Sequence, residues 1–306
     1  MKAKFMNIPF FLTMIAILLS RVYQLIFIKD SVARSNWNTI EIALFAIAAI
    51  SVLVMFILSI RPKGVIFYFS FGKSTSTGII GLLSSFLIVF HSIYKLFQYI
   101  NEDRDIMHLL LGILGVATGI ILIFMSISFI NGKVPFEHRG ILTLIPVIWG
   151  IFRLLELFFT YYSTSNKIWA VPDEFAAIFL LLFLLNLAKS LAKLNNHKDL
   201  VKLIFCGLSS VIFTFNYTTL GFINKVLSTG TILTSSSITL IMDLLLAAYI
   251  IMIINSIKLE KETNHQSTKE ENIVESKPLK TDSENTDAMN MSQINQLVDT
   301  IKNESV

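Results

Sequence analysis

Residues 106–130 read IMHLLLGILGVATGIILIFMSISFI, a run of 25 residues that contains no Asp, Glu, Lys or Arg. At 1.5 Å per residue, a helix of this length extends for about 37 Å, which exceeds the roughly 30 Å hydrocarbon core of a bilayer. A lone strand there would leave its backbone polar groups unpaired in lipid. The run therefore predicts a transmembrane helix.

Seven further apolar runs lie on either side of this one. Apolar residues make up 54% of the 306-residue chain and charged residues only 15%, whereas a soluble domain has about 25% charged residues. The sequence thus predicts an all-α, polytopic integral membrane helix bundle in the lipid bilayer, with about eight transmembrane helices. The predicted spans are residues 8–28, 40–60, 77–100, 106–130, 141–162, 173–194, 200–223 and 238–257.

Lysine and arginine residues are divided unevenly between the two ends of these spans. With the N-terminus inside, thirteen of them fall on cytoplasmic segments or at the C-terminal juncture and six on outer segments, which is the bias that orients membrane proteins. The first span is expected to stay as an anchor and not to be a cleaved signal peptide, because Arg21 interrupts the region where a cleavage site would lie. We therefore expect a multi-pass protein of the cell membrane with both termini in the cytoplasm.

The second half of the sequence resembles the first. Residues 20–27 read SRVYQLIF and residues 152–159 read FRLLELFF, and an acid follows each Arg by twenty residues, as Glu41 and Asp173. Since each half has four spans, such a repeat would be parallel, related by an axis along the membrane normal. The sequence therefore predicts a 4+4 arrangement, with one four-helix repeat in residues 1–130 and a second in residues 131–257.

Residues 258–306 differ in composition from the rest of the chain. They hold six Lys and ten acidic residues, and such a segment cannot bury enough apolar surface to fold alone. Near its end, apolar residues recur at intervals of three and four, which predicts a short amphipathic helix at about residues 288–302. The segment is expected to be a polar cytoplasmic tail that could bind a protein partner. The recurring residues are Met291, Ile294, Leu297, Val298 and Ile301.

Ionisable and amide side chains interrupt the predicted spans. Such residues are costly in lipid and usually face the interior of a bundle, and in the predicted topology nearly all of them lie in the outer half of the membrane. Arg153 and Glu156 share one helix face by their spacing, and so do His91 and Lys95. The candidates for a ligand site or an intramembrane polar network are Arg21, Gln24, His91, Lys95, Arg153, Glu156, Asp173, Asn216 and Asp243.

Two interpretations of these candidates stay open. Arg153 is expected to contact an acid in the bundle interior, either Glu156 or Asp243, and a buried pair of this kind can simply hold helices in register. Alternatively, the residues line an outward-facing cavity. There the cations Arg21, Lys95 and Arg153 outnumber the in-span acids, which suits a small anionic or zwitterionic solute. The first hypothesis is a transporter or ligand-binding membrane protein. The second is a non-transporting assembly or regulatory protein that acts through its tail.

Motifs of known reactions are missing from the sequence. It has no His-Glu-x-x-His, no Gly-x-Ser-x-Gly and no complete P-loop, since the Gly-Lys-Ser at residues 72–74 lacks the upstream Gly. Cys206, as the sole cysteine, excludes a disulfide framework and a Cys-based metal site. No sustained basic surface with interleaved aromatic residues indicates nucleic-acid binding. We therefore expect no enzymatic activity, no metal and no cofactor.

Overall fold

The computed structural model describes residues 2–26, 37–60, 65–69, 73–103, 106–132, 140–163, 171–192, 197–229 and 235–261. These residues are almost entirely helical, and eight helices are long and apolar enough to cross a membrane. The prediction of an all-α membrane bundle is confirmed, and each end of a span lies within about three residues of its predicted position. The spans are Met6–Ile26, Thr39–Ile60, Thr75–Asn101, Ile106–Asn131, Ile141–Phe159, Val171–Leu191, Leu200–Ile223 and Ser237–Asn255.

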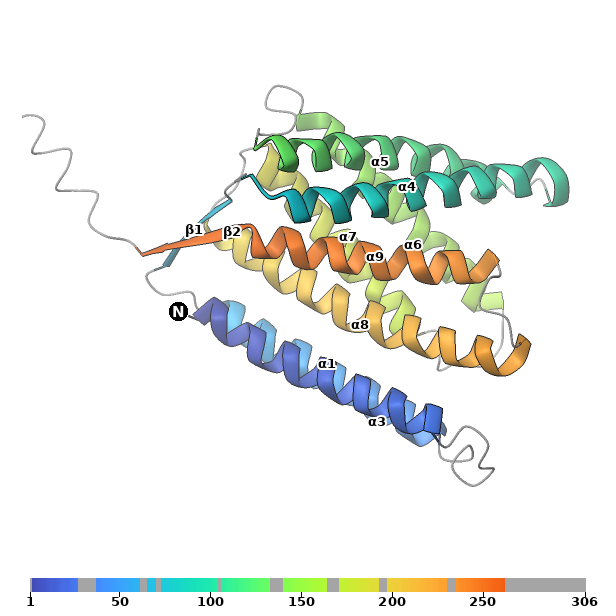
Figure 1. The fold of residues 1–306 in the computed structure, drawn as a ribbon, viewed down its shortest axis with the longest axis horizontal. Coiled ribbons are helices and arrows are strands. Elements are labelled where there is room, and N and C mark those ends of the chain that lie inside the picture. Colours follow the sequence, from blue (N-terminus) through green and yellow to red (C-terminus); the bar gives the residue numbers. More distant parts are fainter. Residues whose placement is uncertain are drawn as a thin grey trace, which may run out of the picture. The chain divides into compact units, whose positions relative to one another are not determined.

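The helices are connected in an up-and-down order (Figure 1). A π-helical turn, η1 (Tyr99–Asp103), continues α4, and a 3-10 helix, η2 (Gly140–Leu144), precedes α6. The helices are α1 (Lys2–Ile26), α3 (Trp37–Ile60), α4 (Thr75–Gln98), α5 (Ile106–Asn131), α6 (Ile145–Ser163), α7 (Val171–Leu191), α8 (His197–Thr229) and α9 (Ser235–Asn255).

Proline marks the beginning of two helices. Pro172 lies in the first turn of α7, followed by Asp173 and Glu174, because acids are favoured beside the N-terminal backbone N–H groups and proline fits the first turn. Pro146 lies inside the fifth span, as expected. It falls in the first turn of α6, after the 3-10 helix, where the missing N–H of proline interrupts no intrahelical hydrogen bond.

Six helices, α4 to α9, form a closed ring. Each packs against the next one in the chain, and α9 packs against α4. In Figure 1, α4, α9 and α8 lie in front of α6 and α7. Helices α4, α6 and α8 end where α5, α7 and α9 begin, and we call this the pocket end of the bundle. The opposite end, where the strands lie, is the strand end.

Small residues allow α4 and α5 to approach each other closely. A Cβ atom at Gly78 or Gly81 would fall well inside contact distance of Ser126 on α5, and one at Gly119 would collide with Val89 on α4. In lipid, where apolar surface gains nothing by leaving water, close packing of this kind is a main source of helix association. The seam between α4 and α5 is therefore one of the tightest parts of the ring.

Helices α1 and α3 form a hairpin that lies against α8, outside the ring. An aromatic cluster joins them, since the ring of Phe45 on α3 lies 5.8 Å from that of Phe175 and 6.0 Å from that of Phe213. The rings of Phe56 and Phe205 lie 5.6 Å apart. The helices are thus grouped as six and two, and this grouping does not follow the predicted boundary near residue 130. The 4+4 duplication stays a prediction.

Two short strands were not expected from the sequence. Strand β1 (Val65–Phe69) follows α3, and strand β2 (Ile257–Lys261) follows α9. They pair antiparallel, with Val65 opposite Lys261 and Phe69 opposite Ile257. Helix α9 therefore ends at Asn255 and not at residue 257, and residues 258–261 belong to the folded part. The rest of the predicted tail, including the amphipathic segment, lies outside the described residues.

Polarity is arranged in the bundle as a bilayer requires. Large apolar side chains point outward from many helices, for example Leu19 (66% exposed), Phe86 (60%) and Phe124 (56%). Polar side chains such as Ser84, Thr118 and Ser126 are fully buried. A soluble monomer rarely exposes so much contiguous apolar surface, whereas lipid is a good solvent for apolar side chains and disfavours exposed polar ones.

Candidate functional site

A pocket of about 370 Å³ lies within the ring, towards the pocket end. All six helices contribute to its wall. The apolar part includes Leu111, Leu220 and Leu240, and the rest includes one histidine and five charged side chains. These six are His91, Lys95, Arg153, Glu156, Asp173 and Asp243, all of them predicted site residues.

Arg153 and Asp243 connect opposite sides of the ring. Arg153 is on α6 and Asp243 on α9, three positions apart in the closed order of six helices. The Nη2 atom of Arg153 donates to Oδ1 of Asp243 at 2.5 Å, and the hydroxyl of Tyr217 on α8 donates to Oδ2 of the same carboxylate. We call Arg153, Asp243 and Tyr217 the crossbar. The predicted contact of Arg153 with an acid of the interior is confirmed, with Asp243 as its partner.

The crossbar lies within the membrane-spanning part, and its carboxylate is buried, whereas the side chain of Arg153 is 11% exposed. Asp243 is 3% exposed and lies about 9 Å along the helix axis from Ser237, where the eighth span begins. The guanidinium carbon of Arg153 lies 5.5 Å from the ring centre of Trp149, in cation–π range. One guanidinium nitrogen of Arg153, Nη1, is buried and has no hydrogen-bond partner among the described residues. Arg153 therefore keeps N–H groups for a further acceptor.

The crossbar separates the pocket from a smaller cavity deeper in the ring. Arg153, Asp173, Tyr217 and Asp243 line both spaces. The deeper cavity has a volume of about 10 Å³ and is otherwise lined mainly by apolar residues such as Leu246, so it has room for about one water molecule. The crossbar is thus the floor of the pocket and the ceiling of this cavity.

A second ion pair lies in the wall of the pocket on the α5 side. Lys95 of α4 donates from Nζ to Oε1 of Glu156 on α6 at 2.7 Å, and Nε2 of His108 on α5 lies 3.9 Å from the same oxygen. The side chains of Lys95 and Glu156 are 18% and 23% exposed, more than those of Arg153 at 11% and Asp243 at 3%. Glu156 therefore pairs with Lys95. It does not pair with Arg153, although the two residues are three positions apart on one helix and their spacing would allow an ion pair.

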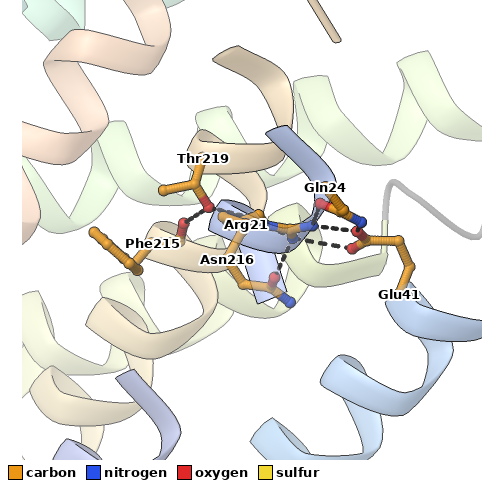
Figure 2. A network of polar contacts seen from close by, with 6 residues as sticks. All are labelled: Arg21, Gln24, Glu41, Phe215, Asn216 and Thr219. Atoms are coloured by element: carbon orange, nitrogen blue, oxygen red, sulfur yellow. Dashed lines mark hydrogen bonds and ion pairs between the residues drawn. The ribbon is translucent and has the colours of Figure 1, made fainter. Parts of the chain in front are cut away.

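Arg21, Gln24 and Asn216 are predicted site residues that do not line the pocket. They form a separate network with Glu41 and Thr219 (Figure 2), which we call the Arg21 network. Arg21 pairs with Glu41 through both carboxylate oxygens, with Nη2 to Oε2 at 3.0 Å. It also donates from Nη1 to Gln24 Oε1 at 2.7 Å and from Nε to Thr219 Oγ1 at 3.3 Å. Its Nη2 atom donates to Oδ1 of Asn216 at 2.6 Å and to the backbone carbonyl of the same residue at 3.1 Å.

The Arg21 network is closed. Every nitrogen of the guanidinium has an acceptor, and Gln24 also donates to Glu41 at 2.8 Å. Arg21 and Asn216 are 3% and 1% exposed. A buried charge that is paired and fully hydrogen-bonded fixes the geometry of its helices. The network therefore fastens the α1–α3 hairpin to α8 and leaves no group of Arg21 for a ligand.

The charge balance of the pocket differs from the sequence-based expectation. Because Arg21 lies elsewhere, the pocket holds two permanent cations, Lys95 and Arg153, against three acids, Glu156, Asp173 and Asp243. The expected excess of cations is therefore absent from the pocket. No group of three or more His, Cys, Asp or Glu side chains in the described part of the chain has the arrangement of a metal site.

Sequence reasoning missed three side chains of the site. Tyr217, Trp149 and His108 contact the charged residues described above. An aromatic residue within an apolar run is usually a packing residue, and nothing local distinguishes Trp149 from its neighbours. The position of Tyr217 directly after Asn216, among the polar residues of an otherwise apolar span, was the available signal.

Comparison of the chain with protein-family models, with curated proteins and with solved structures finds no match. Its class therefore rests on the fold. Eight long apolar helices with an apolar exterior and buried charges make it a multi-pass integral membrane protein.

Proposed function

We propose that this protein is a solute-binding membrane protein of the transporter type, and that its ring pocket takes a small solute with an anionic group. The observation that carries the proposal is the Nη1 atom of Arg153, which is buried in the pocket wall without an acceptor among the described residues. A buried donor left unpaired costs about 1–3 kcal/mol, and more when the group is charged. A solute that accepts from it would recover that cost.

The chemistry of the pocket supports a small polar ligand. Its volume of about 370 Å³ is at the lower end of the range of about 300–1,000 Å³ for small-molecule sites, and such sites combine apolar walls with a few polar groups. A guanidinium presents a planar set of donors that matches a carboxylate or a phosphate. The residues Leu111, Leu220 and Trp149 supply the apolar wall.

The distribution of positive charge suggests the side from which the solute enters. The pocket end carries the segments with fewer Lys and Arg residues, which the positive-inside rule assigns to the outside. A solute would then reach Arg153 from outside the cell. Passage to the other side requires the crossbar to open, because the cavity beneath it has a volume of only about 10 Å³.

Binding can be measured on the purified full-length protein in lipid nanodiscs. Inorganic phosphate, succinate, butyrate and four-carbon amino acids would be tested by calorimetry and by thermal stabilisation. We expect binding by at least one of these, and its loss in Arg153→Gln. The matched control is Lys189→Gln. This variant removes a positive charge from an exposed position in the last turn of α7, at the strand end of the bundle and away from the pocket. Uptake into proteoliposomes then separates transport from binding. The absence of binding by every compound would contradict the proposal.

A further inference from the structure

The crossbar joins two helices that face each other across the ring. The other polar contacts between ring helices join helices that are closer in the ring. Most of them join direct neighbours, and the pair of Lys95 and Glu156 joins α4 and α6, which both pack against α5. Arg153 and Asp243 close the floor of the pocket by a single ion pair, with Tyr217 holding the second carboxylate oxygen. The space directly beneath is the deeper cavity. A solute that separated this pair would therefore connect the two spaces.

The charges of the pocket select the kind of solute that can separate the pair. An anion alone would compete with Asp243 for Arg153 and leave the carboxylate of Asp243 without its cation, in a pocket that already contains more acids than permanent cations. A cation alone would occupy Asp243 and leave Arg153 without its ion-pair partner, with only the charges of Asp173 and Glu156 nearby. A molecule with both charges can supply a carboxylate to Arg153 and an ammonium group to Asp243, so that neither buried charge is left unpaired.

We infer that the solute is a small zwitterion of the amino-acid type, and that it opens the crossbar by replacing each partner of the Arg153–Asp243 pair. This inference rests on the proposed function and adds the charge of the ligand and the step that admits it. The carboxylate takes the free Nη1 atom of Arg153 first and then the position of Asp243 on Nη2. The ammonium group takes Asp243, which keeps its hydrogen bond from Tyr217.

A matched set of four-carbon compounds tests the charge requirement on the full-length protein in nanodiscs. We expect 2-aminobutyrate or 4-aminobutyrate to bind at least about tenfold more tightly than butyrate and butylamine. Each zwitterion makes one more charge-assisted contact than either control compound, and one such contact accounts for about a tenfold change in affinity. Binding of butyrate or phosphate as tight as that of both zwitterions would overturn the inference and leave the proposed function intact. Binding of butylamine alone, or of no compound, would overturn both.

The variant Asp243→Asn distinguishes a ligand contact from a structural role. It keeps the shape of the side chain and removes the charge that the ammonium group needs. We expect the zwitterion to bind about tenfold more weakly while butyrate binds equally well or more tightly, because Arg153 no longer has a competing carboxylate. A structural defect would weaken both ligands, and that result would overturn the inference. The control Glu174→Gln removes an acid in the first turn of α7 that does not line the pocket, and it should keep the preference for the zwitterion.

Opening of the crossbar is tested by access to the deeper cavity. Ala247 is 3% exposed and lines that cavity, and the chain has only one native cysteine, the buried Cys206. In a Cys206→Ala background, Ala247→Cys would be labelled with a membrane-impermeant maleimide from the pocket end. We expect the bound zwitterion to speed labelling on the order of tenfold, because the rate follows the population of the open state. Thr239→Cys, in the upper pocket, should react without ligand. An unchanged rate at Ala247→Cys with saturating zwitterion would overturn the opening step.

Discussion

Asn216 and Tyr217 are consecutive residues of α8, yet their side chains belong to two different polar networks. Asn216 accepts a hydrogen bond from Arg21 on α1 at 2.6 Å, and Tyr217 donates to Asp243 on α9. Successive residues on a helix point about 100° apart, so one helix can serve two neighbours at the same depth. Helix α8 therefore connects the hairpin outside the ring with the crossbar inside it.

Removing the charge of Arg21 should destabilise the protein through its partner. The variant Arg21→Leu leaves Glu41, which is 8% exposed, without its cation, and we expect a loss of about 3–5 kcal/mol in the free energy of unfolding. The double variant Arg21→Leu with Glu41→Leu should recover most of this loss, because no charge remains to be buried. Denaturation of the purified protein in detergent measures both. A double variant less stable than the single one would contradict the account of a closed ion pair.

The two ion pairs of the pocket should differ in their effect on stability. Lys95 and Glu156 are partly exposed, so Lys95→Gln should cost about 1 kcal/mol or less. Asp243→Leu leaves the buried Arg153 unpaired and should cost about 3–5 kcal/mol. The same denaturation measurement compares them. Equal losses of unfolding free energy for the two variants would show that the crossbar is as hydrated as the pair of Lys95 and Glu156.

The close packing of α4 can be tested at Gly81. An added methyl group would meet the side chain of Ser126 on α5 and come within 2.6 Å of the ring of Tyr249 on α9. We expect Gly81→Ala to cost about 1–3 kcal/mol, as overpacking does in other cores. Gly150→Ala is the control, because its nearest neighbour is the flexible end of Leu181 at 3.2 Å. If Gly150→Ala proves the more damaging variant, the α4–α5 seam is looser than described.

The orientation in the membrane is tested by reporter fusions. A reporter that is active only in the cytoplasm should be active when fused after Lys63 or Lys198, because the segments near these points are rich in positive charge. It should also be active after Val306, because an even number of spans places both termini on the same side. It should be silent after Asn36, Asp103 or Thr229. Reversed signals at any two of the six points would contradict the topology with both termini inside.

The tail separates the two functional hypotheses. Strand β2 ends at Lys261, so a truncation that keeps every described element should remove residues 262–306 only. If the pocket carries the function, the truncated protein should still insert and bind solute with unchanged affinity. Loss of cellular function with insertion and binding intact would favour the alternative, a protein that assembles with or regulates a partner through its tail.

Several features of this protein could be predicted from local sequence. Eight apolar runs set the number and length of the helices, since the thickness of the bilayer imposes about 20 residues on each span. Pro172 and its two following acids marked the start of α7, because their effect depends only on nearby backbone groups. The charges within spans indicated where the interior polar groups would lie, because lipid excludes them.

The partners of those charges depend on tertiary structure. Arg153 is 90 residues from Asp243, and Lys95 is 61 residues from Glu156, so no spacing rule along one helix could pair them. Arg21 resembled Arg153 in its sequence context, yet the packing of the hairpin against α8 placed it outside the ring. By itself the sequence determined the membrane class, the spans and the interior polar residues, because hydropathy acts locally. The six-membered ring, the pocket and the crossbar arise only when the surfaces of distant helices fit together, and that fit depends on side-chain shape at close contacts.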